Sequence, residues 1–225
     1  MLWQNNGDNM KATLLNSMGD DNTVVDAARV SFKKGYKEFT EAQNHKLIKY
    51  LAEHKHYSPF GHCFASFHVK APIFVARQLL KHEYLRCNEV SRRYVDDTPE
   101  FYMPEVWRGR AKDKKQGSSD KVIIVQDYLG DEVVHDPVDW SIRVSLDTYE
   151  RLLEEGVAPE MARIVLPLNM YTEWFWSGSL DAFANMAKLR CKPDTQEETR
   201  LIANQISEQM LEKFPVSWSE LTKWK

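Results

Sequence analysis

Two segments that lie far apart in the chain alternate between apolar and other side chains, and this pattern constrains the fold most. The first places on one face Cys63, Ala65, Phe67 and Val69, with His62, Phe64, Ser66 and His68 on the other. The second places on one face Leu168, Met170, Thr172, Trp174 and Trp176. A period of two is typical of a β-strand. Segments 63–69 and 168–176 are therefore predicted to be strands.

Most of the remaining chain has helical patterns. Residues 23–32 are predicted to form a helix with Thr23 as a candidate cap, and residues 41–54 a second helix. Pro72 stands where a first helical residue would be, which predicts a helix to about His82. Residues 121–134 are also predicted to be helical.

Two longer helices are expected toward the C-terminus. From Pro137 apolar residues recur every three or four positions as far as Leu153, and Gly156 ends the helix. The last helix is expected to start at Thr195, which forms a capping box with Glu198. Strands and helices do not strictly alternate, so the fold class is predicted to be α+β.

Composition excludes several classes of protein. The 225 residues are 43% hydrophobic, which suits one soluble globular unit over 1–225 with an exposed polar loop at about 108–121. No run of about 18 apolar residues predicts a membrane span, and the N-terminus lacks the pattern of a signal peptide. The net charge of −3 gives no global attraction for nucleic acid.

The cysteines, histidines and glycines narrow the chemistry further. Cys63, Cys87 and Cys191 form no CxxC pair, so neither a zinc ribbon nor a disulfide framework is expected. A cytoplasmic location, or host cytoplasm for a viral protein, fits best. No histidine spacing predicts a metal site. The nine glycines form neither a Rossmann fingerprint nor a P-loop.

The segment 77–94 carries the densest chemistry. Gln78, Lys81 and His82 are spaced to share one helical face, and the residues that follow include Arg86, Cys87, Asn88, Glu89, Ser91, Arg92 and Arg93. Guanidinium groups suit phosphates because their fork donates two parallel hydrogen bonds. The segment indicates binding of a phosphate-bearing small molecule, most simply a nucleotide. The alternative is an ordinary solvated face.

At this point the sequence resembles the flavin-dependent thymidylate synthase family (ThyX). The family signature is Arg-His-Arg, seven residues and Ser, and here Lys81-His82-Glu83 is followed after seven residues by Ser91. Further blocks that are similar to the family are 27–32, 58–62, 69–78 and 162–169. These blocks lie in the family's order from about residue 20 to residue 206.

The resemblance implies a fold, an assembly and a reaction. The fold would be a central, mostly antiparallel sheet flanked by helices, in a homotetramer with active sites between subunits. The reaction would be reductive methylation of dUMP to dTMP, in which methylenetetrahydrofolate donates the carbon and NADPH supplies the hydride through FAD. No cysteine nucleophile is then needed.

The resemblance also assigns residues. The expected dUMP ligands are Gln78, Glu89, Ser91, Arg92, Arg93, Arg163 and Arg190. The expected FAD ligands are Ser31, Ser58, Lys81, His82, Glu83, Glu89 and Asn185. Catalysis is assigned to Arg190, which would polarise the uracil carbonyl, with Ser91 as a substrate ligand and His56 on the folate and flavin side.

This chain departs from the family at several positions. Lys81 and Glu83 replace the two signature arginines, Gly61 replaces a common Glu, and Cys191 lies in a segment that departs from the usual pattern. Three alternatives stay open: a related enzyme that hydroxymethylates the pyrimidine, a nucleotide-binding homologue without activity, and a helical interaction domain without a ligand.

Overall fold

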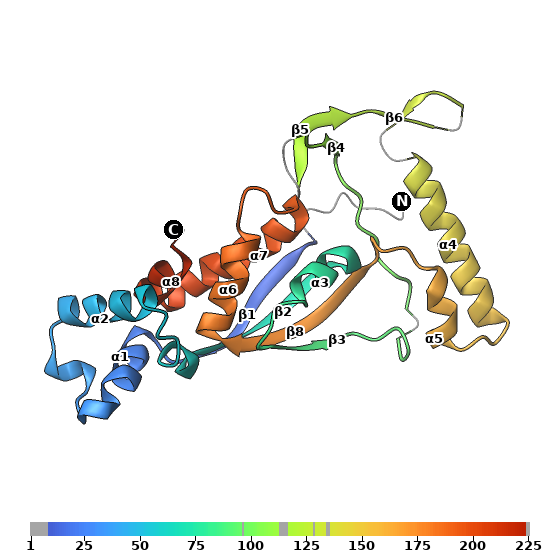
Figure 1. Cartoon of the computed structure of the whole chain (residues 1–225). Coiled ribbons are helices and arrows are strands. Elements are labelled where there is room, and N and C mark those ends of the chain that lie inside the picture. The colour runs from blue at the N-terminus through green and yellow to red at the C-terminus, as the bar shows by residue number, and fades with distance from the viewer. Residues whose placement is uncertain (1–8, 96, 113–116, 128, 134–135, 224–225) are drawn as a thin grey trace.

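A four-stranded antiparallel sheet forms the centre of the computed structural model, which describes residues 9–95, 97–112, 117–127, 129–133 and 136–223 (Figure 1). The strand order is β1 (Lys11–Met18), β2 (Phe64–Pro72), β8 (Tyr171–Ser179) and β3 (Leu85–Glu89). Both predicted strands are confirmed as the two central, paired strands, with Phe67 opposite Trp176. The second predicted strand, β8, begins at Tyr171 rather than at residue 168, because residues 168–169 form a turn.

Helices cover one face of this sheet. The face carries Phe67 and Trp176, and both rings pack against Phe183 of α6 (Leu180–Arg190), with centroids 5.2 and 5.5 Å away. Helix α7 (Glu197–Lys213) lies beside α6 and contacts β1. Large aromatic rings that leave water supply much of the stability of such a core. The predicted α+β class with a mostly antiparallel sheet is confirmed.

The N-terminal helices pack beside the sheet with α8 (Pro215–Thr222). These are α1 (Asp21–Arg29) and α2 (Glu41–Glu53), with short 3₁₀ turns η1 (Val30–Phe32), η2 (Tyr36–Glu38) and η3 (Phe60–His62). The predicted helix 41–54 is confirmed. The candidate cap Thr23 is wrong, because Asp20 caps α1 and Thr23 is its capping-box partner.

Helix α3 (Ile73–Leu79) is shorter than predicted. Pro72 is its N-cap rather than its first residue. The chain leaves the helix at Leu80 and turns through Tyr84, whose φ of 64° is left-handed, into β3. Lys81 and His82 therefore do not continue a helical face from Gln78.

The segment from Trp107 to Val133 differs from both predictions made for it. The expected loop and the expected helix 121–134 are replaced by the strands β4 (Trp107–Arg110), β5 (Ser118–Ile123), β6 (Val125–Gln126) and β7 (Glu132–Val133). Val122, Ile123 and Ile124 are β-branched, which favours strand over helix. Residues 113–116, 128 and 134 of these predictions lie outside the described residues.

Helix α4 (Asp136–Glu154) confirms the helix predicted from Pro137, and Gly156 follows it with a φ of 84°, as expected of a terminating glycine. After it come α5 (Pro159–Ala162) and the 3₁₀ turn η4 (Arg163–Val165). In Figure 1, α4 and α5 lie beyond the N-terminal end of β8.

The start of α7 corrects the last predicted cap. Gln196 is the N-cap and makes no side-chain cap hydrogen bond. The Thr195 hydroxyl donates instead to the carbonyl of Leu189 at 3.0 Å, and Glu198 is buried in an ion pair. The described residues include no helix with the length and apolar character that a membrane crossing needs.

Candidate active site

A cleft of about 650 Å³ opens where β3 ends and β8 begins. The predicted ligands that line it are Glu89, Ser91, Arg92, Arg93 and Arg163. Glu89 is the last residue of β3 and accepts a hydrogen bond from the Thr172 hydroxyl of β8 at 2.7 Å. The antiparallel pairing of β3 with β8 therefore brings residues from two distant parts of the sequence to one cleft.

The cations of the cleft fall into two groups. Arg92 is paired with Asp97 at 2.8 Å, and Lys70 is paired with Glu100 at 2.9 Å. Among the described residues, no ion pair is recorded for Arg93 or Arg163. These two guanidinium groups are the ones available to an anion.

Ser91 lies beside one of these free cations. The Arg93 Nε donates to the Ser91 hydroxyl oxygen at 3.2 Å. This contact leaves the hydroxyl proton free to donate to a ligand, and it brings no base that could activate the oxygen as a nucleophile. Ser91, Arg93 and Arg163 together have the chemistry of a phosphate site.

A second cluster joins three other predicted residues outside that cleft. Arg190 Nε donates to His82 Nε2 at 3.0 Å, and Arg190 Nη2 donates to the backbone carbonyl of Gln78 at 3.1 Å. Burial, and then the charge of Arg190, lower the pKa of His82 to about 4. His82 is therefore neutral at pH 7, and it carries its proton on Nδ1 because Nε2 accepts.

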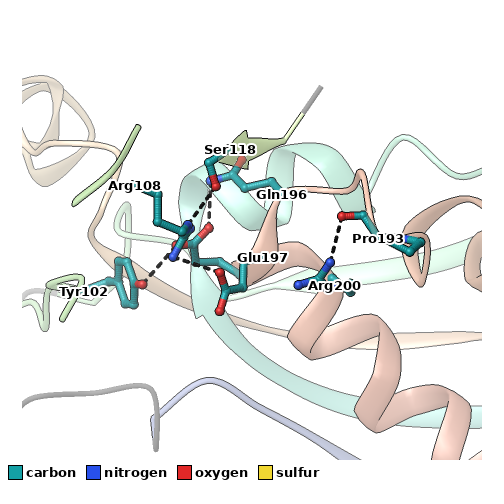
Figure 2. Close-up of polar contacts among 8 residues, drawn as sticks. Tyr102, Arg108, Ser118, Pro193, Gln196, Glu197 and Arg200 are labelled. Carbon is teal, nitrogen blue, oxygen red and sulfur yellow. Dashed lines mark hydrogen bonds and ion pairs between the residues drawn. The ribbon is translucent and has the colours of Figure 1, made fainter. Parts of the chain in front are cut away.

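A chain of hydrogen bonds leads from Gln78 into the protein. Gln78 Nε2 donates to Gln196 Oε1 at 2.6 Å, and Gln196 Nε2 donates to Glu198 Oε2 at 3.0 Å. Arg108 Nη2 and the Tyr102 hydroxyl both donate to Glu198 Oε1. Figure 2 shows Arg108 between Tyr102, Ser118 and Glu197.

Glu198, the carboxylate in this chain of hydrogen bonds, is ionised. Burial alone would raise the pKa of Glu198, but the hydrogen bond and charge of Arg108 outweigh burial and hold the pKa below its ordinary value. The sequence singled out Glu198 as the capping-box partner of Thr195, and it assigned no site role to Gln196. Arg108 was assigned to the exposed loop, and no sequence pattern pairs it with Glu198.

The other predicted flavin and folate ligands line neither the cleft nor the second cluster. Lys81 and Glu83 are exposed in the turn before β3, and Asn185 is exposed on α6. Ser31 belongs to η1, while His56 and Ser58 precede η3. Of these elements, η3 packs against α6. Within the described residues, the predicted site residues therefore lie in separate groups.

One residue that sequence reasoning missed lies on α6, a turn after Asn185. Burial, and then the neighbouring charge of Lys55, lower the pKa of Lys188. No ion pair is recorded for Lys188 within the described part of the chain. Two neighbouring ammonium groups without a counter-ion suit an anionic ligand.

The described residues contain no group of three or more His, Cys, Asp or Glu side chains placed to hold a metal ion. His68 Nε2 lies 2.9 Å from Glu173 Oε2, whereas His62, which was predicted to share its strand face, belongs to η3. Cys63, Cys87 and Cys191 are all free thiols.

Comparison with known proteins decides the family. The model of the thymidylate synthase complementing protein family matches residues 13–216. The chain belongs to this family. The resemblance inferred from the signature residues is thereby confirmed, even though Lys81 and Glu83 depart from that signature.

Relatives and solved structures agree with the family. The flavin-dependent thymidylate synthase of Thermus thermophilus is 43% identical over 92% of this chain and 73% of its own length. That of Kosmotoga olearia is 42% identical over 91% of this chain and 86% of its own. The UMP/dUMP methylase PolB from Streptomyces cacaoi, bound with 5-Br dUMP, has a TM-score of 0.77 at 28% identity, covering 95% of this chain and 94% of PolB.

Proposed function

We propose that this protein is a flavin-dependent thymidylate synthase that methylates dUMP to dTMP. Methylenetetrahydrofolate would donate the carbon, and NADPH would be the reductant. The observation that carries the proposal is the group formed by Ser91, Arg93 and Arg163 in a nucleotide-sized cleft, in a chain of this family. The names of its relatives and the 5-Br dUMP bound to PolB support the same reaction and substrate.

The phosphate of dUMP would bind at the free cations of the cleft. Arg93 and Arg163 can each donate two parallel hydrogen bonds to phosphate oxygens, and the Ser91 hydroxyl can donate one more hydrogen bond. The paired Arg92 would instead shape the cleft through its bridge to Asp97. The phosphate contacts would fix where the base lies.

Arg190 would act on the pyrimidine itself. Its guanidinium is held at Nε by His82 and at Nη2 by the Gln78 carbonyl. A positive charge directed at a uracil carbonyl stabilises the negative charge that develops on the ring when C5 becomes nucleophilic. Neutral His82 serves this role because it accepts from the guanidinium and adds no competing positive charge.

The residues of the flavin side fit an anionic cofactor such as FAD. Lys188 and Lys55 are neighbouring cations, Asn185 lies on α6, and Ser58 precedes η3, which packs against α6. Lys81 and His56 would complete this side, with Ser31, Glu83 and Glu89 as further ligands. When bound, FAD would supply the hydride that it takes from NADPH.

We further propose that the complete site forms between copies of the chain, in a homotetramer. The supporting observation is that Gln78 and Arg190 lie outside the cleft that Ser91, Arg93 and Arg163 line. A second copy could bring one group opposite the other. The three free cysteines also suit a reducing, cytoplasmic compartment.

The test compares Arg190→Ala with a matched control, Arg200→Ala. Arg200 also donates to a backbone carbonyl, that of Pro193 at 2.8 Å, as Figure 2 shows, and it has no place in the site. We expect dTMP formation by wild type only when dUMP, methylenetetrahydrofolate, NADPH and FAD are all present. Arg190→Ala should lose at least a hundredfold in kcat while Arg200→Ala keeps it. No dTMP from FAD-loaded wild type would refute the proposal, and the mass of the product would reveal hydroxymethylation.

A further inference from the structure

The hydrogen-bond chain from Arg108 to Gln78 has a direction that follows from the chemistry of its members. An ionised carboxylate can only accept hydrogen bonds. Gln196 must therefore turn its NH₂ group toward Glu198, which directs its carbonyl oxygen toward Gln78. Gln78 can meet that oxygen only with its own NH₂ group.

The direction of the chain fixes what Gln78 offers to a ligand. Because its NH₂ group donates to Gln196, the Gln78 Oε1 is left as an acceptor, and no hydrogen bond to this oxygen is recorded among the described residues. Were Gln196 reversed, Gln78 would turn its oxygen inward and present only N–H donors. The half-buried amide is thus set as an acceptor by a carboxylate two side chains away.

Gln78 and Arg190 are held together. The Arg190 Nη2 donates to the backbone carbonyl of Gln78, which ties the guanidinium to the residue that carries the amide, so that the two form one unit. This unit offers a donor from Arg190 beside an acceptor from Gln78. Its complement is a ring edge with a carbonyl oxygen next to an N–H group.

We propose that Glu198 and Gln196 are positioning residues that select uracil over cytosine by fixing Gln78 as a hydrogen-bond acceptor. This inference rests on the proposed function, because it assumes a pyrimidine nucleotide at Arg190. Uracil carries a proton on N3 between two carbonyl groups, and it satisfies both members of the pair. Cytosine has an unprotonated N3, whose lone pair would face the oxygen of Gln78.

Arg108 stabilises the direction of the hydrogen bonds from Gln78 through Gln196 to Glu198. It pairs with Glu198 and, at 3.2 Å, with Glu197, and its Nε donates to the Ser118 hydroxyl at 2.9 Å. The β4–β5 hairpin, which carries Arg108 and Ser118, thereby takes part in substrate choice without lining the phosphate cleft (Figure 2).

The experiment measures the dissociation constants of dUMP and dCMP by titration calorimetry with FAD-loaded protein. The test variant is Glu198→Gln, which can donate as well as accept and so frees Gln196 to reverse. Its matched control is Glu197→Gln, which removes the same charge beside Arg108 but does not touch Gln196. Gln196→Ala, which breaks the chain and leaves the Arg108–Glu198 pair, is a second test variant in case Glu198→Gln does not fold.

We expect wild type and Glu197→Gln to prefer dUMP by about a hundredfold, in line with the cost of leaving one buried polar group without its hydrogen bond. In Glu198→Gln and Gln196→Ala the preference should fall by about tenfold or more. A wild-type preference for dUMP that both folded test variants keep would overturn the inference and leave the proposed function standing. A wild type that binds neither nucleotide would overturn both.

Discussion

Acidification should destabilise the folded protein through His82 in particular. The pKa of His82 is about 4 in the folded protein, against 6.5 for an ordinary histidine. Between these two values the unfolded chain binds a proton that the folded protein does not bind. Stability contributed by neutral His82 is therefore complete above pH 6.5 and is lost as the pH falls toward 4.

The size of this loss follows from the two pKa values. At about 1.4 kcal/mol for each pH unit, the fall from 6.5 to about 4 corresponds to an upper limit of about 3 kcal/mol. His82 is only half-buried, so solvent screens the repulsion between its charged form and Arg190. We therefore expect a loss of about 1–2 kcal/mol in the free energy of unfolding.

The assay compares urea unfolding of wild type and His82→Gln at pH 7.5 and pH 4.5. Glutamine does not titrate, and its side-chain oxygen can accept from Arg190 Nε. Every other ionisable group is the same in both proteins, so its effect cancels in the difference. Wild type should lose about 1–2 kcal/mol more than the variant on acidification. Equal losses in the two proteins would refute the argument that His82 is held neutral.

Three further predictions concern the cleft, the flavin side and the sheet. Arg163→Ala should weaken dUMP binding at least tenfold and leave deoxyuridine binding unchanged, by calorimetry; equal losses would contradict a phosphate role. Glu83→Arg should tighten FAD binding, followed by flavin fluorescence, if Glu83 faces the pyrophosphate, and unchanged affinity would mean that it points away. Gly178→Ala should lower the free energy of unfolding by about 1–3 kcal/mol, because its methyl would lie 2.5 Å from Leu85 Cδ2 and 2.9 Å from the Tyr84 carbonyl; wild-type stability in urea would show that β3 can shift.

The central strands and two long helices were predictable because each buries one face. The alternation of residues 63–69 and the three- to four-residue spacing after Pro137 directly reflect which side chains are buried. By contrast β3 lies at the edge of the sheet, and apart from Leu85 its side chains are exposed. Its sequence therefore carries no alternation that would identify it.

The capping box predicted at Thr195 failed for a related reason. Local spacing made Thr195 and Glu198 a plausible pair, but tertiary contacts decide where their side chains go. Glu198 meets Arg108 from a hairpin about ninety positions away, and only the fold could reveal this pairing.

The sequence named candidate site residues but did not indicate how they group in space. Glu89, Ser91, Arg93 and Arg163 do meet in one cleft, as nucleotide ligands should. Gln78 and His82 were predicted to share a helical face, whereas α3 ends between them and Arg190 joins them instead. Motif spacing predicts candidate side chains, but backbone turns such as the one at Tyr84 decide which of them come together.

The position of β8 in the sheet has a consequence for how the protein is made. This strand lies between β2 and β3 in the sheet, yet it is synthesised long after both. Phe64 of β2, for example, cannot pair until Ser179 of β8 has been synthesised. Until then β2 and β3 each present an unpaired edge, and such edges recruit other chains. We expect nascent chains that stop before Tyr171 to depend on chaperones, and the yield of this protein to follow how quickly its last third is translated.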